Sequence, residues 1–281
     1  SCGMDRMAVR MTEPHSDPDN ATKPRRTEPY ERTPPEPREH NWRMAWVGTA
    51  TAYNAQGEAL RTWRYAAEAD ADPGAIARRV SADVSHLVKQ RAKIPVHCVQ
   101  DGAKELRILP EMLRSTLPQN SVVRELVDFA HLLGYLDAVV DACEPENDPA
   151  DMKGWYRAEL LRDDRAIDRI WRNLRRKAET LPRESAEPQR KAIAAALSYI
   201  RKRKNKMRYA SLHAAKLTIG SGATEGTCGI MQLRVRRRGQ SWEKPGLRGI
   251  LTIRGLVLSD RWDAAWARYA AKHRSDVRRA A

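Results

Sequence analysis

Two short apolar runs, each followed by a helical pattern, constrain the fold most strongly. The run IPVHCVQD at 94–101 has no polar alternation, and a second strand pattern, SVVRELVDF, covers 121–129. An unbroken apolar run is typical of a parallel strand that is covered on both faces. Helical spacing follows over 104–116 and 130–143, and another helix is predicted over 74–92. The chain is therefore predicted to be an α/β protein.

The earlier part of the chain is predicted to be β-rich with one long loop. Residues 2–11 alternate as a strand does, with Asp5 inside it, and 43–53 and 58–66 form a predicted hairpin. A carboxylate within an apolar strand needs a partner or a metal, because burying it alone is costly. Residues 12–41 hold seven of the sixteen prolines and almost no aliphatic residues. They are predicted to form a flexible surface loop.

A charged helical block follows, over residues 144–205, and no strand pattern interrupts it. Trp155 and Trp171 in this block are predicted to pack against other helices. The alternative is that they stack on DNA bases.

Two further helices are predicted near the end of the chain, over 245–258 and 260–274. The second carries Trp262 and Trp266, which are four residues apart and so lie on one helix face. This spacing predicts that both side chains pack.

The segment Leu217–Arg238 passes from a glycine-rich turn into a predicted helix with Glu225 in its first turn. The positive end of the helix dipole stabilises an ionised carboxylate there. Four arginines follow: Arg234, Arg236, Arg237 and Arg238. An acid beside a guanidinium cluster suits a metal ligand next to a polyanion. The alternative is an ordinary first-turn acid followed by a solvated basic face.

The positive charge is concentrated in the last 81 residues. Residues 201–281 hold 20 basic and 5 acidic residues, which equals the net charge of +15 for the whole chain. They include the run Arg201, Lys202, Arg203 and Lys204. Such a basic region predicts phosphate contacts with a nucleic acid, with a solvated charged face as the alternative. An anionic membrane is a weaker candidate partner, since no amphipathic segment with a long apolar face accompanies the charge.

Polar residues stand at the ends of both predicted parallel strands. Asp101 ends the first, where ligands gather in open α/β sheets, although a helix N-cap is an equal alternative. Asp128 and His131 stand where the second strand meets its helix. A single histidine in such a place is more often a core residue than a catalytic one.

The cysteines and the hydropathy favour a reduced, cytoplasmic protein with no membrane segment. Four cysteines are scattered without CxxC or CxxH pairing, so neither a zinc site nor a disulfide framework is predicted. No apolar stretch approaches the roughly 20 residues of a membrane span.

Several blocks resemble the DDE transposases of the bacterial insertion-sequence Kra type, which are related to the Mutator-like transposases. The blocks are MDRMAV, VGTATAYNAQGEAL, VQDGAKE, DFAHLLGYLDA, KNKMRYASL, IGSGATEG, LRVRRRGQSW and RGLVLSDRWDAAWA. IGSGATEG with the basic block after it is the most specific. The resemblance implies a ribonuclease H-like mixed sheet flanked by helices. Its domains would be a first core part at 1–143, an all-helical insertion at 144–205 and a closing core part at 206–281.

By this resemblance Asp5, Asp101 and Glu225 are the catalytic acids and hold two Mg²⁺ ions, for which Mn²⁺ can substitute. The implied activity is strand cleavage at transposon ends, followed by attack of the freed 3′-hydroxyl on target DNA. The implied partners are DNA and further copies of the chain, in a homo-oligomer on DNA at the bacterial nucleoid. Asp128 and His131 stand where relatives have Cys-x-x-His, which suggests a second-shell role.

The family's amino-terminal region would precede Asp5, so the chain is expected to be the later part of a longer protein. Two other functions remain open. One is a catalytically impaired or domesticated transposase that only binds DNA. The other is a ribonuclease H-like nuclease or resolvase, which would cut without joining.

Overall fold

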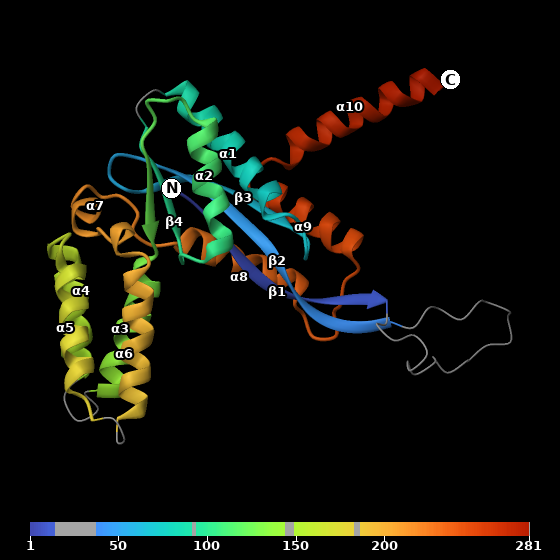
Figure 1. Cartoon of the computed structure of the whole chain (residues 1–281). Coiled ribbons are helices and arrows are strands. Elements are labelled where there is room, and N and C mark those ends of the chain that lie inside the picture. Colours follow the sequence, from blue (N-terminus) through green and yellow to red (C-terminus); the bar gives the residue numbers. More distant parts are fainter. Residues whose placement is uncertain (15–37, 92–93, 144–148, 183–185, 281) are drawn as a thin grey trace, which may run out of the picture. The chain divides into compact units, whose positions relative to one another are not determined.

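The chain is an α/β protein whose five-stranded mixed sheet is flanked by helices (Figure 1). The computed structural model describes residues 1–14, 38–91, 94–143, 149–182 and 186–280. The strand order is β3-β2-β1-β4-β5. The strands are β1 (Cys2–Pro14), β2 (Arg38–Tyr53), β3 (Ala59–Ala67), β4 (Val96–Gln100) and β5 (Val123–Val127).

Two parallel pairings define the later half of the sheet. β1 pairs with β4, with Cys2 opposite Cys98. β4 pairs with β5 along its whole length, from Val96 opposite Val123 onward. Every residue of β4 is buried, as its unbroken apolar sequence predicts.

The helices follow the strands in the predicted order. They are α1 (Pro73–Gln90), η1 (Lys104–Arg107), α2 (Ile108–Thr116), α3 (Phe129–Cys143), α4 (Pro149–Arg162), α5 (Ala166–Thr180), α6 (Glu187–Arg201), η2 (Lys204–Lys206), α7 (Ala210–Ala214), α8 (Gly222–Val235), α9 (Lys244–Leu258) and α10 (Trp262–Ala280). None of the helices in the described part of the chain is long and apolar enough to cross a membrane.

The chain folds into two compact units, which are described separately. The first unit comprises Ser1–Gly3, Ala50–Thr62 and Val80–Ala223. The second comprises Met4–Thr49, Trp63–Arg79 and Thr224–Ala281. Asp101 belongs to the first unit, and Asp5 and Glu225 belong to the second.

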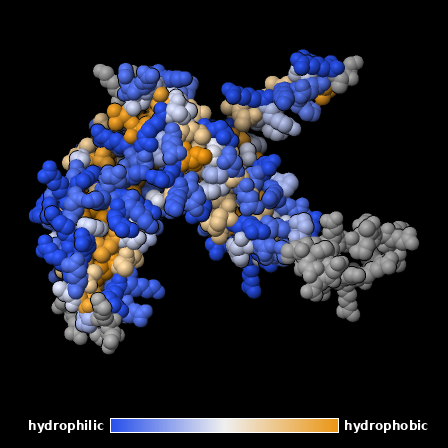
Figure 2. Space-filling view, viewed as in Figure 1, coloured by the Kyte–Doolittle hydropathy of each residue, from blue (hydrophilic) through white to orange (hydrophobic). Residues whose placement is uncertain are grey.

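In the first unit, α3, α4, α5 and α6 lie side by side (Figure 1). Their apolar faces form one core with the inner residues of β4 and β5. Tyr209, which is fully buried, packs edge-on against Phe129 at 4.9 Å and donates its hydroxyl proton to the Val127 carbonyl. In Figure 2, hydrophilic residues cover the outer side of α4 and α5.

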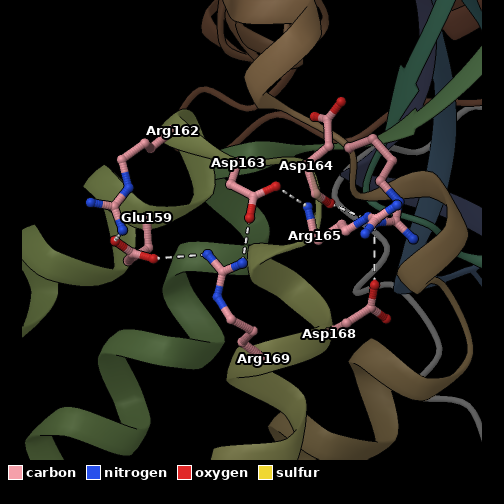
Figure 3. Close-up of polar contacts among 8 residues, drawn as sticks. Glu159, Arg162, Asp163, Asp164, Arg165, Asp168 and Arg169 are labelled. Atoms are coloured by element: carbon pink, nitrogen blue, oxygen red, sulfur yellow. Dashed lines mark hydrogen bonds and ion pairs between the residues drawn. The ribbon is translucent and has the colours of Figure 1, made fainter.

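Ion pairs fix the turn between α4 and α5 (Figure 3). Glu159 is buried and accepts hydrogen bonds from Arg162 and Arg169. Arg169 also pairs with Asp163, whose other oxygen accepts the backbone N–H of Arg165 at 2.8 Å. The guanidinium of Arg169 thus joins a carboxylate of α4 to one in the turn.

In the second unit, β1 and the first part of β2 pack against α8 and α9. The core is formed by apolar side chains of all these elements, among them Val9, Val47, Met231 and Leu251. After α8 the chain returns to β1, where Trp242 forms an isolated parallel bridge with Met11. Its indole nitrogen donates to the Val235 carbonyl at 2.9 Å, which closes the end of α8.

The predicted strands and helices are present, with differences in burial and at their ends. Only the last two residues of β5 are buried, so this strand is not covered on both faces along its length. Helix α10 extends to Ala280, beyond the predicted end at residue 274. Residues 12–14 and 38–41, predicted as loop, extend β1 and β2. Polar contacts support the extension: Glu13 pairs with Arg43 at 2.8 Å and accepts from Asn41 at 3.1 Å. Residues 15–37 lie outside the described residues.

The packing predicted for the tryptophans is wrong for three of the four. Trp155, Trp262 and Trp266 are 45%, 37% and 54% exposed. Trp171 is partly buried against the core of the first unit, as predicted. A shared helix face indicates which side chains lie together, but not whether another element covers them.

Candidate active site and nucleic-acid interface

Asp5 and Glu225 approach the same thiol in the second unit. Asp5, on β1, accepts the Cys228 S–H at an Sγ–Oδ2 distance of 3.6 Å. Burial is the main cause that raises the pKa of this thiol, and the charges of Asp5 and then Glu225 raise it further. Cys228 therefore stays protonated and donates to the carboxylate. This role of Cys228 could not be predicted, because a lone cysteine in a helix carries no positional signal.

The first turn of α8 fixes Glu225 at the protein surface. Thr224, one residue earlier, is buried and shares a 2.6 Å hydrogen bond between its hydroxyl and that of Thr49 on β2. Glu225 itself is exposed and lies in the first helical turn, as predicted. The buried threonine pair anchors the helix start, so the neighbouring carboxylate is held on a rigid element.

Asp101, in the first unit, directly follows β4. Its Oδ1 accepts the Ala103 backbone N–H at 2.7 Å, and its carbonyl oxygen accepts the Tyr199 hydroxyl proton at 2.6 Å. η1 begins after Ala103, which makes no side-chain cap, so Asp101 is not the helix N-cap. The alternative role that the sequence left open is thus excluded, and Asp101 instead forms a turn through its own side chain.

This turn is held by Tyr199 of α6 and by Arg203, two residues beyond the end of that helix. Burial raises the pKa of the Tyr199 hydroxyl, so it remains a donor to Asp101. Four residues later, Arg203 Nε donates to the Gly102 carbonyl at 3.0 Å, and its guanidinium lies 4.4 Å from the Tyr199 ring centroid. The hydrogen bonds of Tyr199 to Asp101 and of Arg203 to Gly102 each join residues about a hundred positions apart. No local pattern in the sequence pairs these residues.

Asp128 connects α3 to the glycine-rich turn before α8. It is buried, its Oδ1 accepts the His131 backbone N–H at 2.6 Å, and its Oδ2 accepts the Ser221 N–H. The His131 ring is exposed, with its centroid 5.6 Å from that of Tyr199. Asp128 therefore has a structural role, while His131 touches the tyrosine that binds Asp101. The second-shell role of this pair stays a prediction.

The arginines at the end of α8 differ in what they contact. Arg234 lies over the Trp242 ring at 5.7 Å, and Arg236 over the Trp42 ring at 5.0 Å. Arg237 Nε donates to the Leu233 carbonyl at 3.2 Å. Arg236, Arg237 and Arg238 are exposed, so their charges reach solvent.

The residues of the run Arg201–Lys204 also differ in what they contact. Arg201 and Lys202 are exposed, whereas Arg203 is committed to the turn at Gly102. Lys204 pairs with Asp168 at 3.3 Å and lies 5.5 Å from the Trp171 ring centroid. Of this run, Arg201 and Lys202 are the better candidates for phosphate contact.

A partly open cavity also lies in the first unit. It measures about 600 Å³ and is lined by parts of α1, β2 and β4 and by residues 215–218. His97 of β4 faces it, is 3% exposed, and neither ring nitrogen has a hydrogen-bond partner within the described ranges. Burial lowers the pKa of His97 to about 4, so the imidazole is neutral near pH 7.

Asp5, Asp101 and Glu225 belong to the residue types that suit a hard cation. All three supply carboxylate oxygens, which Mg²⁺ prefers, and each is at least partly exposed. Asp5 and Glu225 share one unit and Asp101 lies in the other. Within the described part of the chain, no three His, Cys, Asp or Glu side chains form a ready-made metal cluster.

Comparison with protein-family models, curated proteins and solved structures found no match to this chain.

Proposed function

We propose that the chain is the catalytic domain of a DDE transposase with a ribonuclease H-like fold. It would cut DNA strands at transposon ends in a metal-dependent reaction and join the freed 3′-hydroxyl to target DNA. The observation that carries the proposal is the hydrogen bond from Cys228 of α8 to the Asp5 carboxylate of β1. Glu225 lies three residues before Cys228 on the same helix and 220 residues from Asp5 in sequence.

Asp101 directly follows β4, at the carboxyl end of a parallel strand, where ligands gather in open α/β sheets. The proposal requires all three carboxylates to serve one site.

Asp5, Asp101 and Glu225 would hold the Mg²⁺ ions. The bound ions would supply charge stabilisation at the phosphate and at the entering and leaving oxygens. The protein residues supply position. Cys228 orients the Asp5 carboxylate, the Thr49–Thr224 pair anchors Glu225, and Tyr199 and Arg203 hold the turn of Asp101.

The exposed arginines after α8 would bind the DNA backbone. Guanidinium groups pair with phosphate oxygens irrespective of base sequence, so they supply affinity and position. The carboxylates supply the chemistry. Binding and cleavage should therefore be separable by substitution.

Nicking of a supercoiled plasmid that carries the candidate transposon ends tests the proposal. Glu225→Gln should abolish Mg²⁺-dependent or Mn²⁺-dependent nicking and leave DNA affinity within about twofold of the wild-type value, because the phosphate contacts remain. Glu187→Gln is the matched control, since Glu187 is also an exposed first-turn acid, on α6. Nicking by Glu225→Gln at the wild-type rate would contradict the proposal.

A strand-transfer assay separates transposition from simple hydrolysis. A transposase joins a pre-cut end with a free 3′-hydroxyl to target DNA, whereas a nuclease or resolvase yields only cut products. If the wild-type chain neither cuts nor joins while still binding DNA, it is a DNA-binding remnant.

A further inference from the structure

Helix α10 carries a continuous ladder of aromatic rings. Trp262, Trp266, Tyr269 and His273 follow one another on one face, with neighbouring ring centroids 5.7, 5.6 and 6.4 Å apart. Neighbouring ring planes differ by only 18°, 26° and 29°. At a rise of about 1.5 Å per residue, the ladder extends over about 16 Å. The rings thus present a row of nearly parallel π faces.

The ladder is open to solvent instead of packed. Trp266 and Tyr269 are 54% and 61% exposed. Together with Trp262, Ala265 and Leu256 of α9, they line a small hollow of about 210 Å³. Contiguous exposed apolar side chains are typical of a binding surface, because soluble proteins rarely leave such a patch facing water without a partner.

The ladder is flanked by cations. Helix α10 carries five basic and two acidic residues, a net charge of +3. At about 100° per residue, Arg268, Lys272 and Arg279 lie along one side of the ladder. Arg268 and Lys272 are exposed. A row of π faces beside a row of cations matches the two parts of a nucleic-acid strand, its bases and its phosphates.

We propose that α10 binds unpaired DNA, with bases stacked on Trp262, Trp266 and Tyr269 and phosphates on Arg268 and Lys272. The inference takes its substrate class from the proposed function, but it does not depend on the catalytic acids. Stacking needs a base that is free of its partner strand, since paired bases offer no open face. The surface is therefore specific for single-stranded segments and not for duplex.

Charge and composition favour DNA over the other occupants of such a face. A second copy of the chain would bring another helix of charge +3 against the first, which is repulsive. A membrane-bound helix needs a long apolar face, whereas the positions that continue the ladder are Asp276 and Ala280. A polyanion with flat apolar groups matches both the row of rings and the row of cations.

Fluorescence anisotropy with a labelled oligothymidylate in EDTA tests the inference, since EDTA removes catalysis from the measurement. The double substitution Trp266→Ala with Tyr269→Ala should weaken single-strand binding by about tenfold or more. Its affinity for a duplex of equal length should change less than about twofold. Trp266→Phe should retain most of the affinity because it keeps a π face. Trp155→Ala, which removes an exposed tryptophan of α4, is the matched control and should bind as wild type does.

Each other outcome overturns the inference. If the double variant binds oligothymidylate normally but sediments as a smaller species, the face joins copies of the chain. If it loses binding only to anionic phospholipid vesicles, the face meets a membrane. If single-strand and duplex affinities fall equally, α10 contacts phosphates and not bases. The binding measurement in EDTA does not involve cleavage, so a failure of the catalytic proposal is recognised separately by the nicking assay.

Discussion

Arg203 Nε donates a hydrogen bond to the Gly102 carbonyl, 3.0 Å away, and its guanidinium occupies the space that a Cβ at residue 102 would need. Gly102 has a φ of +83°, a conformation that side chains disfavour. The turn that presents Asp101 is therefore shaped by glycine and closed by an arginine from the end of α6. Arg203, from the helical block at 144–205, thus contacts the turn that holds Asp101, a proposed catalytic acid.

Arg203→Ala should lower the rate of DNA cleavage by 10- to 100-fold, on the order expected for a misplaced catalytic group. The reason is that the Gly102 carbonyl loses its hydrogen bond from Arg203, so the turn is held by Tyr199 alone. Lys202→Ala removes the neighbouring exposed charge and is the control for a general loss of basicity. Single-turnover nicking rates at saturating DNA measure the effect. If both variants slow cleavage equally, Arg203 acts only through its charge.

Asp128→Ala should reduce the free energy of unfolding by about 2–3 kcal/mol. The substitution removes acceptors for the backbone N–H groups of His131 and Ser221 at a buried position. Asp128→Asn keeps one acceptor oxygen and should cost less. Urea unfolding followed by circular dichroism measures both variants. Asp276→Ala, on exposed α10, should change stability by less than about 0.5 kcal/mol; an equal effect of the two alanine variants would contradict this role.

The order of strands and helices could be predicted because hydrophobic periodicity is a local property. The buried run before Asp101 and the glycine-rich turn before Glu225 each appear within a few residues of sequence. The contacts of Asp101 could not be predicted, because Tyr199 lies 98 residues away and no local pattern pairs the two residues. The two acids near Cys228 likewise come from opposite ends of the chain. The acids could be proposed from residue type and position in the sequence. The groups that orient them are visible only in the folded chain.

The basic residues show a second limit of sequence reasoning. Arg203 is indistinguishable in sequence from Arg201, yet one is committed to a turn and the other is exposed. A long cationic side chain serves either role, depending on which carbonyl or ring lies within reach. The prediction that the tryptophans of α10 are packed failed for a similar reason. Their spacing shows that they share a helix face, but not whether another element covers that face.

His97 should make the protein less stable as the pH falls from about 6.5 to about 4. Its pKa is about 4 in the folded protein, below the ordinary value of 6.5, mainly because of burial. Between these values the unfolded chain binds a proton that the folded chain does not, so acid favours unfolding. His97→Val should flatten this dependence by up to about 1.4 kcal/mol per pH unit. Urea midpoints measured across this pH range test it.

His86→Gln is the control for the pH experiment. His86 is exposed on α1, so the substitution controls for the removal of a histidine that is not buried. A nuclear magnetic resonance titration of the His97 ring protons gives the pKa directly. A midpoint near 6.5 would contradict a buried neutral imidazole.

Replacing Arg236, Arg237 and Arg238 together by alanine should weaken duplex DNA binding and make it less sensitive to salt. Each phosphate contact contributes about 0.9 to the slope of log K against log salt, because binding releases condensed counterions. Removing Arg78, Lys89 and Arg91, which are exposed on or beside α1, is the matched control for lost charge. If the salt slope falls equally in both triple variants, the arginines after α8 act through net charge alone. A larger fall in the first variant locates phosphate contacts at the end of α8, the helix whose first turn carries Glu225.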